Sequence, residues 1–280
     1  MIAVLGAGGQ LGSAFCRLLG AAAHPVTRAE LDLTDLAAIQ PWMEARRPEV
    51  VVNCAAYTAV DAAEEDEATA RRVNADAVGV LAEAARDSGA RLVTFSTDYV
   101  FDGTKPEPYV ESDPPHPMSA YGRTKAEGER LALEANPEAL VVRTSWVLSG
   151  THPNFAATML RLIRQGPVQV VNDQRGRPTI VDDLAPATLA CVEAGAYGIV
   201  HLTNQGETTW YGLACEIAQI AGLDPDRVSP CTTEEFPRPA PRPANSVLDS
   251  ERLEGLGVAA LPHYRPSLER VVADLVARGF

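Results

Sequence analysis

The stretch SAYGRTKAEGE, residues 119–129, holds a tyrosine four residues before a lysine. At that spacing, Tyr121 and Lys125 would share one face of a helix. A phenol beside an ammonium group is a candidate proton donor, because the cation favours the phenolate and lowers the pKa of the phenol. The spacing equally fits a half-exposed tyrosine packed against a lysine stem. The rest of the chain has to decide between these two interpretations.

A glycine-rich segment, GAGGQLG, follows directly after the apolar run MIAVL and opens a helical pattern. This order of strand, glycine loop and helix is what a dinucleotide site requires. Gly6 would permit the tight turn, Gly9 would let the backbone approach a pyrophosphate, and Gly12 would allow close helix–strand packing. The free N–H groups at the helix N-terminus would then favour the phosphates. The sequence therefore predicts a bound dinucleotide.

The end of the second predicted strand bears on which dinucleotide binds. NAD sites carry Asp or Glu there for the ribose hydroxyls, whereas this chain has Arg28, with Glu30 two residues on. An arginine can pair with a 2′-phosphate, which favours NADPH. Glu30 keeps NADH possible, and Arg28 can also be read as a solvated surface charge. Asp32 and Leu33 are expected to flank the adenine.

Short apolar runs alternate with helical patterns through the first half of the chain. Among them are EVVVNCAA, ARLVTFSTDYVF and a long alanine-rich helical segment that ends at Gly89. This alternation predicts an α/β fold with a Rossmann-type, doubly wound parallel sheet. We expect residues 1–150 to form mainly the dinucleotide-binding domain. Residues 151–280 would form mainly a smaller α/β substrate-binding lobe, with some chain crossing back to the sheet.

Composition excludes several classes of partner. The net charge is −13, which argues against nucleic acid or an anionic membrane. Five widely spaced cysteines without a CxxC pair indicate free thiols in a reducing compartment. The histidines are scattered too, so no metal site is expected. We see neither a signal peptide nor an apolar run that could span a membrane, and we expect a cytoplasmic protein.

Seven longer motifs narrow the interpretation: VVNCAAYTAVDAAE, STDYVFDG, YGRTKAEGE, RTSWV, NFAATML, VNDQRGRPT and RPANS. With the glycine loop, they closely resemble the dTDP-4-dehydrorhamnose reductase family of extended short-chain dehydrogenase/reductases, from residue 2 to about residue 275. The resemblance implies that NADPH or NADH reduces the C4 ketone of dTDP-4-dehydro-β-L-rhamnose, the last step of dTDP-L-rhamnose biosynthesis. STDYVF and RTSWV are specific to this group, whereas GxxGxxG and YxxxK occur throughout a large superfamily.

The same resemblance implies roles for individual residues. Tyr121 would donate the proton, Lys125 would tune it and hold the nicotinamide ribose, and Thr97 would offer a hydroxyl to the ketone oxygen. Further implied cofactor contacts are Gln10, Leu11, Ala56, Tyr57 and Thr58, besides the glycines, Arg28, Asp32 and Leu33. Implied substrate contacts are Val60, Thr97, Asp98, Tyr121, Trp146, Gln174, Arg242 and Asn245. Trp146 could instead be a core residue, and Arg175, Arg177 and Arg238 are alternatives to Arg242 for the diphosphate.

One departure from the family concerns magnesium. Some members dimerise through magnesium bound by glutamates, but this chain has Ala14 at one of those positions and Asp182 at another. A shared magnesium site needs several carboxylates at short range. We therefore expect no magnesium bridge, and either a monomer or a homodimer that is built differently.

Two other functions stay open. A nucleotide-sugar epimerase or dehydratase of the same superfamily would retain and regenerate its dinucleotide, so net consumption of NADPH would separate it from a reductase. A regulatory subunit resembling that of methionine adenosyltransferase would associate with a larger catalytic chain and show little turnover. The presence of Thr97, Tyr121 and Lys125 together favours the reductase.

Overall fold

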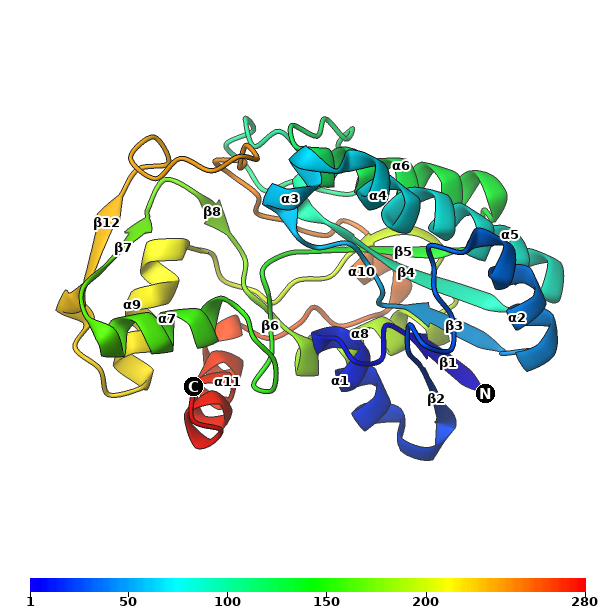
Figure 1. The fold of residues 1–280 in the computed structure, drawn as a ribbon, viewed down its shortest axis with the longest axis horizontal. Helices are drawn as coiled ribbons and strands as arrows, with labels where there is room; N and C mark the ends of the chain where they lie inside the picture. The colour runs from blue at the N-terminus through cyan, green and yellow to red at the C-terminus, as the bar shows by residue number, and fades with distance from the viewer.

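A six-stranded sheet forms the centre of the computed structural model, which describes residues 1–280 (Figure 1). Its strands lie in the order β10-β5-β4-β3-β1-β2, and every neighbouring pair is parallel. They are β1 (Ile2–Leu5), β2 (Ala23–Val26), β3 (Val50–Asn53), β4 (Arg91–Thr97), β5 (Leu140–Thr144) and β10 (Gly198–His201). The chain moves outward from β1 in both directions, which confirms the predicted doubly wound, Rossmann-type sheet.

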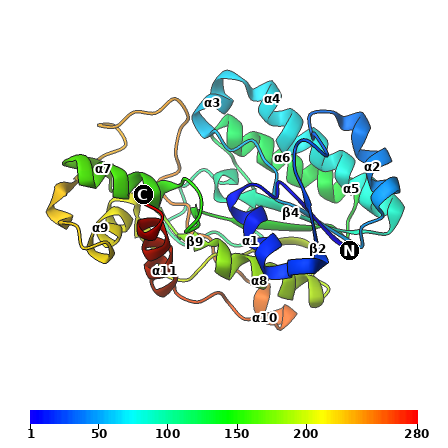
Figure 2. The same cartoon turned by 60° about the horizontal axis from the view of Figure 1, so that its bottom comes forward.

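Helices cover both faces of this sheet. On one face lie α2 (Ile39–Arg46), α5 (Ala77–Ser88) and α6 (Ala120–Ala135), with α3 (Val60–Glu65) and α4 (Glu67–Arg71) beside α6. On the other face α1 (Gln10–Leu19) packs against α8 (Val181–Glu193) (Figure 2). Because both faces are covered, the central strands are rich in buried apolar residues, with polar residues such as Thr97 and Asn53 at their carboxyl ends. None of the helices combines the length and the apolar character that crossing a membrane requires.

The alanine-rich segment predicted as one helix is helical from α4 to the end of α5 and contains a π-helical turn. Between α4 and α5 the chain forms a π-helical turn, η3 (Arg72–Asp76), and α5 ends as predicted at Gly89, which adopts a left-handed φ of 72°. Helix α6 approaches this turn very closely. A Cβ atom on Gly128 would lie 2.0 Å from the backbone oxygen of Asn74, so only glycine fits there. Turns of this kind are frequent at functional sites.

The later part of the chain builds a second hydrophobic cluster (Figure 1). It lies between α7 (Phe155–Gln165), α9 (Trp210–Ile220), α11 (Tyr264–Ala277) and the parallel pair β7 (Val168–Val171) and β12 (Val228–Cys231). Two further short pairs are β6 (Val147–Leu148) with β9 (Thr179–Ile180), and β8 (Arg175–Gly176) with β11 (Thr208–Thr209). The remaining elements are η1 (Gly20–Ala22), η2 (Leu36–Ala38), η4 (Asp98–Val100), η5 (Pro225–Arg227) and α10 (Leu253–Leu256). The division at residue 150 stays a prediction.

The proline-rich segment between β12 and residue 245 forms neither helix nor strand. It crosses from the second cluster toward α3 of the first, where the backbone N–H of Ala240 donates to Asp61 at 3.3 Å. Prolines at alternate positions from 237 to 243 restrict its backbone to extended conformations. This segment is therefore an ordered wall between the two parts of the molecule.

Candidate active site

Thr97 and Tyr121 meet at the carboxyl end of the central strand β4. Thr97 is the last residue of β4, and its hydroxyl donates to Asp98 Oδ1 at 3.0 Å and accepts from the Tyr99 N–H at 3.2 Å. Tyr121 lies in the first turn of α6, which begins where Ser119 Oγ accepts from the Gly122 N–H at 3.1 Å. The cap and the strand end thus fix both hydroxyls at the edge where parallel sheets bind their ligands.

Burial sets the pKa values of the two expected catalytic groups. It raises the pKa of Tyr121 to about 12, against a hydrogen bond with Thr97 that lowers it. Burial also lowers the pKa of Lys125 to about 8. The expected lowering of the Tyr121 pKa by Lys125 is not observed, because burial outweighs it and the Lys125 ammonium donates to the Phe95 carbonyl at 2.6 Å. A phenol that stays protonated at neutral pH is the form that a proton donor needs.

The glycine loop has the backbone shape that its sequence predicts. Gly6 adopts a left-handed φ of 68°, and a Cβ atom there would lie 2.7 Å from the backbone nitrogen of Ala55, at the end of β3. A Cβ on Gly12 would lie 2.2 Å from the Gly6 oxygen, so α1 can start this close to β1 only with glycine. The loop therefore opens between β1 and β3, at the switch point of the sheet, below the N-terminus of α1.

A pocket of about 200 Å³ lies beside this loop and brings several predicted cofactor residues together. The predicted residues that line it are Gly6, Arg28, Asp32, Leu33, Ala56 and Tyr57. Arg28 is 78% exposed at its mouth, where its Nε donates to Asp32 Oδ2 at 3.1 Å. The Tyr57 backbone is held on both sides by the Asn74 amide, at 2.8 and 3.0 Å. The pocket therefore brings together the residues predicted to hold the adenosine end of a dinucleotide.

Other predicted cofactor residues lie outside that pocket. The Gln10 side chain accepts from Ser149 Oγ at 2.9 Å and Asn154 Nδ2 at 3.1 Å, so it joins the glycine loop to the loop before α7. Leu11 packs against the core under the sheet. Thr58 is exposed, and the lining of this pocket does not include it. The side chains of Gln10 and Leu11 are thus used within the protein. Their backbone N–H groups lie in the first turn of α1, where a phosphate would bind.

We expect Arg28→Ala to reduce the preference for NADPH over NADH. A charge-assisted contact with a 2′-phosphate contributes about 1.5–3 kcal/mol, or roughly a tenfold to hundredfold preference. The measurement is kcat/KM for both cofactors in the wild type and the variant. Arg278→Ala, which removes an exposed arginine without an ion pair, is the control. An unchanged ratio in Arg28→Ala would make Arg28 a plain surface charge.

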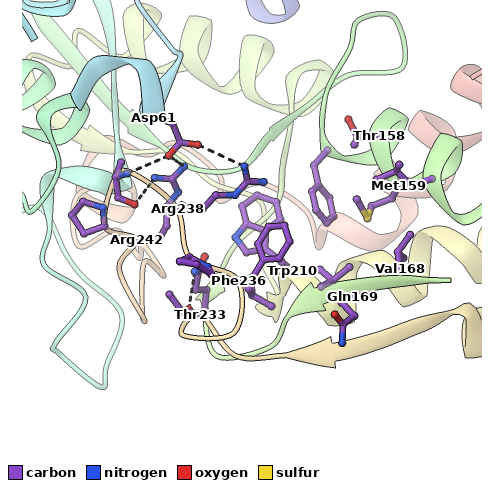
Figure 3. Close-up of a pocket in the computed structure, with 18 of the residues that line it drawn as sticks. Asp61, Thr158, Met159, Val168, Gln169, Trp210, Thr233, Phe236, Arg238 and Arg242 are labelled. Atoms are coloured by element: carbon purple, nitrogen blue, oxygen red, sulfur yellow. Dashed lines mark hydrogen bonds and ion pairs between the residues drawn. The ribbon is translucent and has the colours of Figure 1, made fainter. Parts of the chain in front are cut away.

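A second and larger pocket, of about 650 Å³, lies between the proline-rich segment and the second hydrophobic cluster (Figure 3). Its walls are largely aromatic and aliphatic, and its rim carries Asp61, Arg238 and Arg242. Asp61 accepts from Arg242 at 2.8 Å and lies 3.9 Å from Arg238. One carboxylate thus faces two guanidinium groups, which leaves a net positive rim in an acidic protein.

Tyr99 connects this pocket to the catalytic pair. Its ring lines the pocket and packs edge-on against Tyr121, with ring centroids 5.8 Å apart. The guanidinium of Arg242 lies over the other part of the same ring, 5.8 Å from its centroid. A ligand whose charged part contacts Arg242 can therefore extend past Tyr99 toward Tyr121 and Thr97.

Two predicted substrate residues, Gln174 and Arg242, line the large pocket. Gln174 donates to Thr233 Oγ1 at 2.9 Å, which ties β8 to the proline-rich segment. Of the alternative arginines, only Arg238 lines the pocket too. Arg175 pairs with Glu207 at 3.0 Å and Arg177 with Asp249 at 3.4 Å, both outside it. The structure thus narrows the candidates for the diphosphate to Arg242 and Arg238.

Trp146 lies one layer behind the pocket wall. Its ring stacks on Trp210 with centroids 3.6 Å apart, and a Cβ on Gly176 would clash with it at 2.3 Å. Its backbone has a left-handed φ of 45°, which is rare for a bulky residue and marks a site where the surroundings enforce the conformation. Trp146 supports Trp210, and Trp210 lines the pocket.

Asp98, Val60 and Asn245 complete the predicted substrate set. Burial raises the pKa of Asp98 to about 6, against hydrogen bonds from Ser246 and Thr97. Val60 begins α3, next to Asp61. Asn245 lies outside the pocket lining, and its amide is occupied: it donates to the carbonyls of residues 105 and 107 and accepts from the N–H of residue 247. Asn245 therefore holds the loop around residues 105–107, and its contact with substrate stays a prediction.

Sequence reasoning missed four residues that shape the large pocket: Asp61, Tyr99, Trp210 and Phe236. Asp61 and Tyr99 stand inside motifs that were already recognised, VVNCAAYTAVDAAE and STDYVFDG, so the motifs held a signal for them. Trp210 and Phe236 had no comparable signal, because only the fold brings α9 and the proline-rich segment to the same wall.

The carboxylates relevant to magnesium have partners within this chain. Asp182 pairs with Arg17 of α1 at 2.8 Å, and Asp183 accepts from Asn204 at 2.7 Å. No group of three or more His, Cys, Asp or Glu side chains is placed to hold a metal ion. That the enzyme lacks a magnesium bridge stays a prediction, as does its oligomeric state.

Comparison with known proteins supplies the family. The model of the RmlD substrate binding domain matches residues 1–277. This chain belongs to that family. A dTDP-4-dehydrorhamnose reductase of Streptomyces griseus is 45% identical, and the alignment covers 98% of this chain and 94% of the relative. A protein of Streptomyces antibioticus named "Probable dTDP-4,6-dihydroxy-2-methyloxan-3-one 4-ketoreductase" is also 45% identical, over 98% of this chain and 95% of that one.

A solved structure agrees with this assignment. The dTDP-4-dehydrorhamnose reductase of Bacillus anthracis in complex with NADP is 35% identical, has a TM-score of 0.93 and is matched over 98% of each chain. The predicted resemblance to dTDP-4-dehydrorhamnose reductases is therefore confirmed. The similarity spans both the sheet that carries Thr97 and Tyr121 and the later elements that build the large pocket.

Proposed function

We propose that this protein is an NADPH-dependent oxidoreductase that reduces the C4 ketone of dTDP-4-dehydro-β-L-rhamnose to the alcohol of dTDP-β-L-rhamnose. The single observation that carries the proposal is that Tyr99 links the two sites: it packs against Tyr121 on one side and lies under Arg242 of the large pocket on the other. A sugar nucleotide has this bipartite chemistry, with an anionic diphosphate at one end and a reactive carbonyl at the other. The family assignment agrees with the proposal.

The residues present fit a bound NADPH. Gly6 and Gly12 let the loop and α1 lie directly against β1 and the end of β3, where no Cβ would fit, and Arg28 lines the same pocket as Gly6. Arg28 would hold the 2′-phosphate, the start of α1 the pyrophosphate, and Lys125 the nicotinamide ribose. When bound, NADPH supplies the hydride for C4 of the sugar.

Within the chain, Tyr121 and Thr97 act on the ketone oxygen. The carbonyl oxygen gains negative charge as the hydride reaches C4, and hydroxyl groups that donate to it stabilise that charge. Tyr121 then gives its proton to the oxygen, which becomes the new hydroxyl group. In the structure the Thr97 hydroxyl donates its one proton to Asp98 Oδ1 and accepts from the Tyr99 N–H, so it has to turn away from Asp98 to donate to the ketone oxygen. Burial raises the pKa of Tyr121, so its phenol is still protonated when negative charge develops on the ketone oxygen.

The first experiment is an NADPH absorbance assay with dTDP-4-dehydrorhamnose supplied by upstream enzymes. The proposal expects one NADPH consumed for each sugar reduced. An epimerase or dehydratase would convert substrate without net consumption, and a regulatory subunit would do neither. No loss of absorbance with either NADPH or NADH would reject the proposal.

We expect Arg242→Gln to raise the KM for the sugar nucleotide. Losing a charge-assisted contact with the diphosphate would weaken binding roughly tenfold to hundredfold, while the KM for NADPH stays nearly constant. Arg175→Gln is the matched control, because Arg175 pairs with Glu207 outside the pocket. Steady-state kinetics with each substrate varied would test this. Equal effects of the two variants would argue against Arg242 as the diphosphate contact.

A second candidate substrate is a related dTDP-linked 4-keto sugar. The relative from Streptomyces antibioticus favours it, since its printed name describes a 4-ketoreductase of a different sugar and its identity to this chain is equally high. Both substrates would use the same hydroxyl pair and the same diphosphate contacts. The ratio of kcat/KM for the two sugar nucleotides decides between them.

A further inference from the structure

A buried ion pair lies directly behind the catalytic lysine. Arg143 of β5 contacts Glu129 of α6 with two hydrogen bonds, Nε to Oε1 at 2.9 Å and a terminal nitrogen to Oε2 at 2.7 Å. The side chains are 1% and 5% exposed. Such a two-point contact fixes the carboxylate in position as well as in charge. Neither residue touches the cofactor pocket or the large pocket.

The surroundings of Arg143 hold this pair rigidly. Its guanidinium lies over the ring of Phe101, 5.1 Å from the centroid, and another nitrogen points to His201 Nε2 at 3.4 Å. His201 Nδ1 lies 2.8 Å from the carbonyl of Asp249, so Nδ1 carries the ring proton and Nε2 is free to accept. Burial lowers the pKa of His201, the nearby Glu111 carboxylate raises it and the Arg143 charge lowers it; the net shift is downward, which favours the neutral imidazole. Arg143 therefore has Glu129 as its one charged partner.

Glu129 is four residues after Lys125, one helical turn along the same face of α6. Both side chains line a cavity of about 10 Å³ between α6, β4 and η3, and they are the only ionisable residues in its lining. Apart from Arg143 on β5, which pairs with Glu129, the groups that face them from other elements are polar but uncharged: Thr94, Ser96 and the Phe95 carbonyl on β4, and Asn74 on η3. The Glu129 carboxylate is thus the one counter-charge that Lys125 meets.

The other titratable groups near α6 act elsewhere. Tyr121 is uncharged at neutral pH because burial raises its pKa. Asp98 acts on Tyr121, whose pKa it raises. Arg71 and Asp76 pair with each other at 3.4 Å on the outer side of the η3 turn. Burial disfavours the ammonium form of Lys125, and Glu129 opposes that effect.

We propose that Glu129, held in place by Arg143, is a positioning residue for the reduction: it keeps Lys125 in the charged form that can donate to the nicotinamide ribose. This inference rests on the proposed function in one respect: its test measures the NADPH-dependent reduction. An ammonium group can donate to the ribose hydroxyls at pH values where it stays protonated, and it loses that donor when it becomes an amine. The carboxylate on the next turn extends the pH range in which the ammonium form is present.

The test is the pH dependence of kcat/KM for NADPH, which reports the free enzyme. In the wild type the activity should fall as pH rises through about 8, the pKa of Lys125. Tyr121, with a pKa of about 12, titrates far above that range. The doubly substituted E129Q/R143M protein removes both charges together, so no buried charge is left without a partner. In this variant we expect the fall of kcat/KM on the alkaline side of the pH profile, the basic limb, to occur about one pH unit lower than in the wild type.

Two further variants make the result decisive. Glu127→Gln is the matched control, because Glu127 lies on the outer face of α6, where it pairs with Arg130 and Arg71. The basic limb of this variant should stay at the wild-type pH. If E129Q/R143M does not fold, Glu129→Asp keeps both charges but shortens the carboxylate, and a smaller shift in the same direction is expected. Folding is checked by circular dichroism across the pH range. A uniform loss of activity with an unmoved limb would reduce Glu129 to a structural role and overturn the proposal.

Discussion

Tyr121→Phe should reduce kcat about 100-fold to 10,000-fold, because it removes a positioned acid and leaves the aromatic ring in place. The ring keeps its edge-on contact with Tyr99, so the pocket wall is preserved. The hydroxyl is the only group lost, and Thr97 cannot replace it because an aliphatic hydroxyl is a far weaker acid than a phenol. NADPH affinity should change little. The measurements are steady-state kinetics and NADPH binding by fluorescence.

The control for this prediction is Tyr197→Phe. Tyr197 is 59% exposed and lies outside both pockets, so the same loss of a hydroxyl should leave kcat at the wild-type value. Turnover of Tyr121→Phe near the wild-type rate would remove Tyr121 from the mechanism. A variant that has lost NADPH binding as well would indicate a packing role for the hydroxyl instead.

Arg143→Ala should lower the free energy of unfolding by about 3–5 kcal/mol, since it leaves the buried Glu129 carboxylate without a partner. The loss of the guanidinium over Phe101 removes packing as well as charge. Chemical denaturation by urea, followed by circular dichroism, measures the change. A loss of this size in the free energy of unfolding is a large fraction of the total stability of an ordinary domain, so Arg143→Ala should also unfold at a lower temperature.

Arg130→Ala is the matched control for the stability prediction. Arg130 also makes short ion pairs, with Glu127 at 2.8 Å and Glu134 at 2.6 Å, but on the exposed face of α6. Water and salt screen such pairs, so the unfolding midpoint should barely move. If Arg143→Ala behaves like Arg130→Ala, the buried pair is not what holds β5 against α6.

Much of the fold can be predicted from local sequence patterns, such as apolar runs for buried strands and glycines at helix ends. Val51 and Val52 stand in a continuous apolar run because both faces of β3 are covered, and Gly89 ends its helix because only glycine adopts that φ easily. The turn at Asn74 has no such local signature. It lies against Gly128, which belongs to another helix, so helical periodicity predicted the helix but not its π-helical turn.

The candidate site divides in the same way. The glycine loop, the STDYVF motif and the YxxxK spacing can each be read from a few neighbouring residues. The structure places Gly6 in a tight turn after β1, Thr97 at the end of β4 and Tyr121 in the first turn of α6. Residues on the walls of the large pocket depend on contacts between distant segments, such as Asp61 with Arg242. The hydrogen bonds of Asn245 were not predicted for the same reason, because the carbonyls that its amide contacts belong to a loop near residue 105 that no pattern connects to it.

The most direct test of the central claim follows the hydride itself. The enzyme is incubated with dTDP-4-dehydrorhamnose and NADPH deuterated at the transferable position of the nicotinamide, and the sugar nucleotide is analysed by mass spectrometry and proton NMR. The account predicts one deuterium at C4 of dTDP-rhamnose for each NADPH oxidised; in the same time Tyr121→Phe should form far less product, with the same deuterium content. Product without deuterium at C4, or conversion without net oxidation of NADPH, would contradict it.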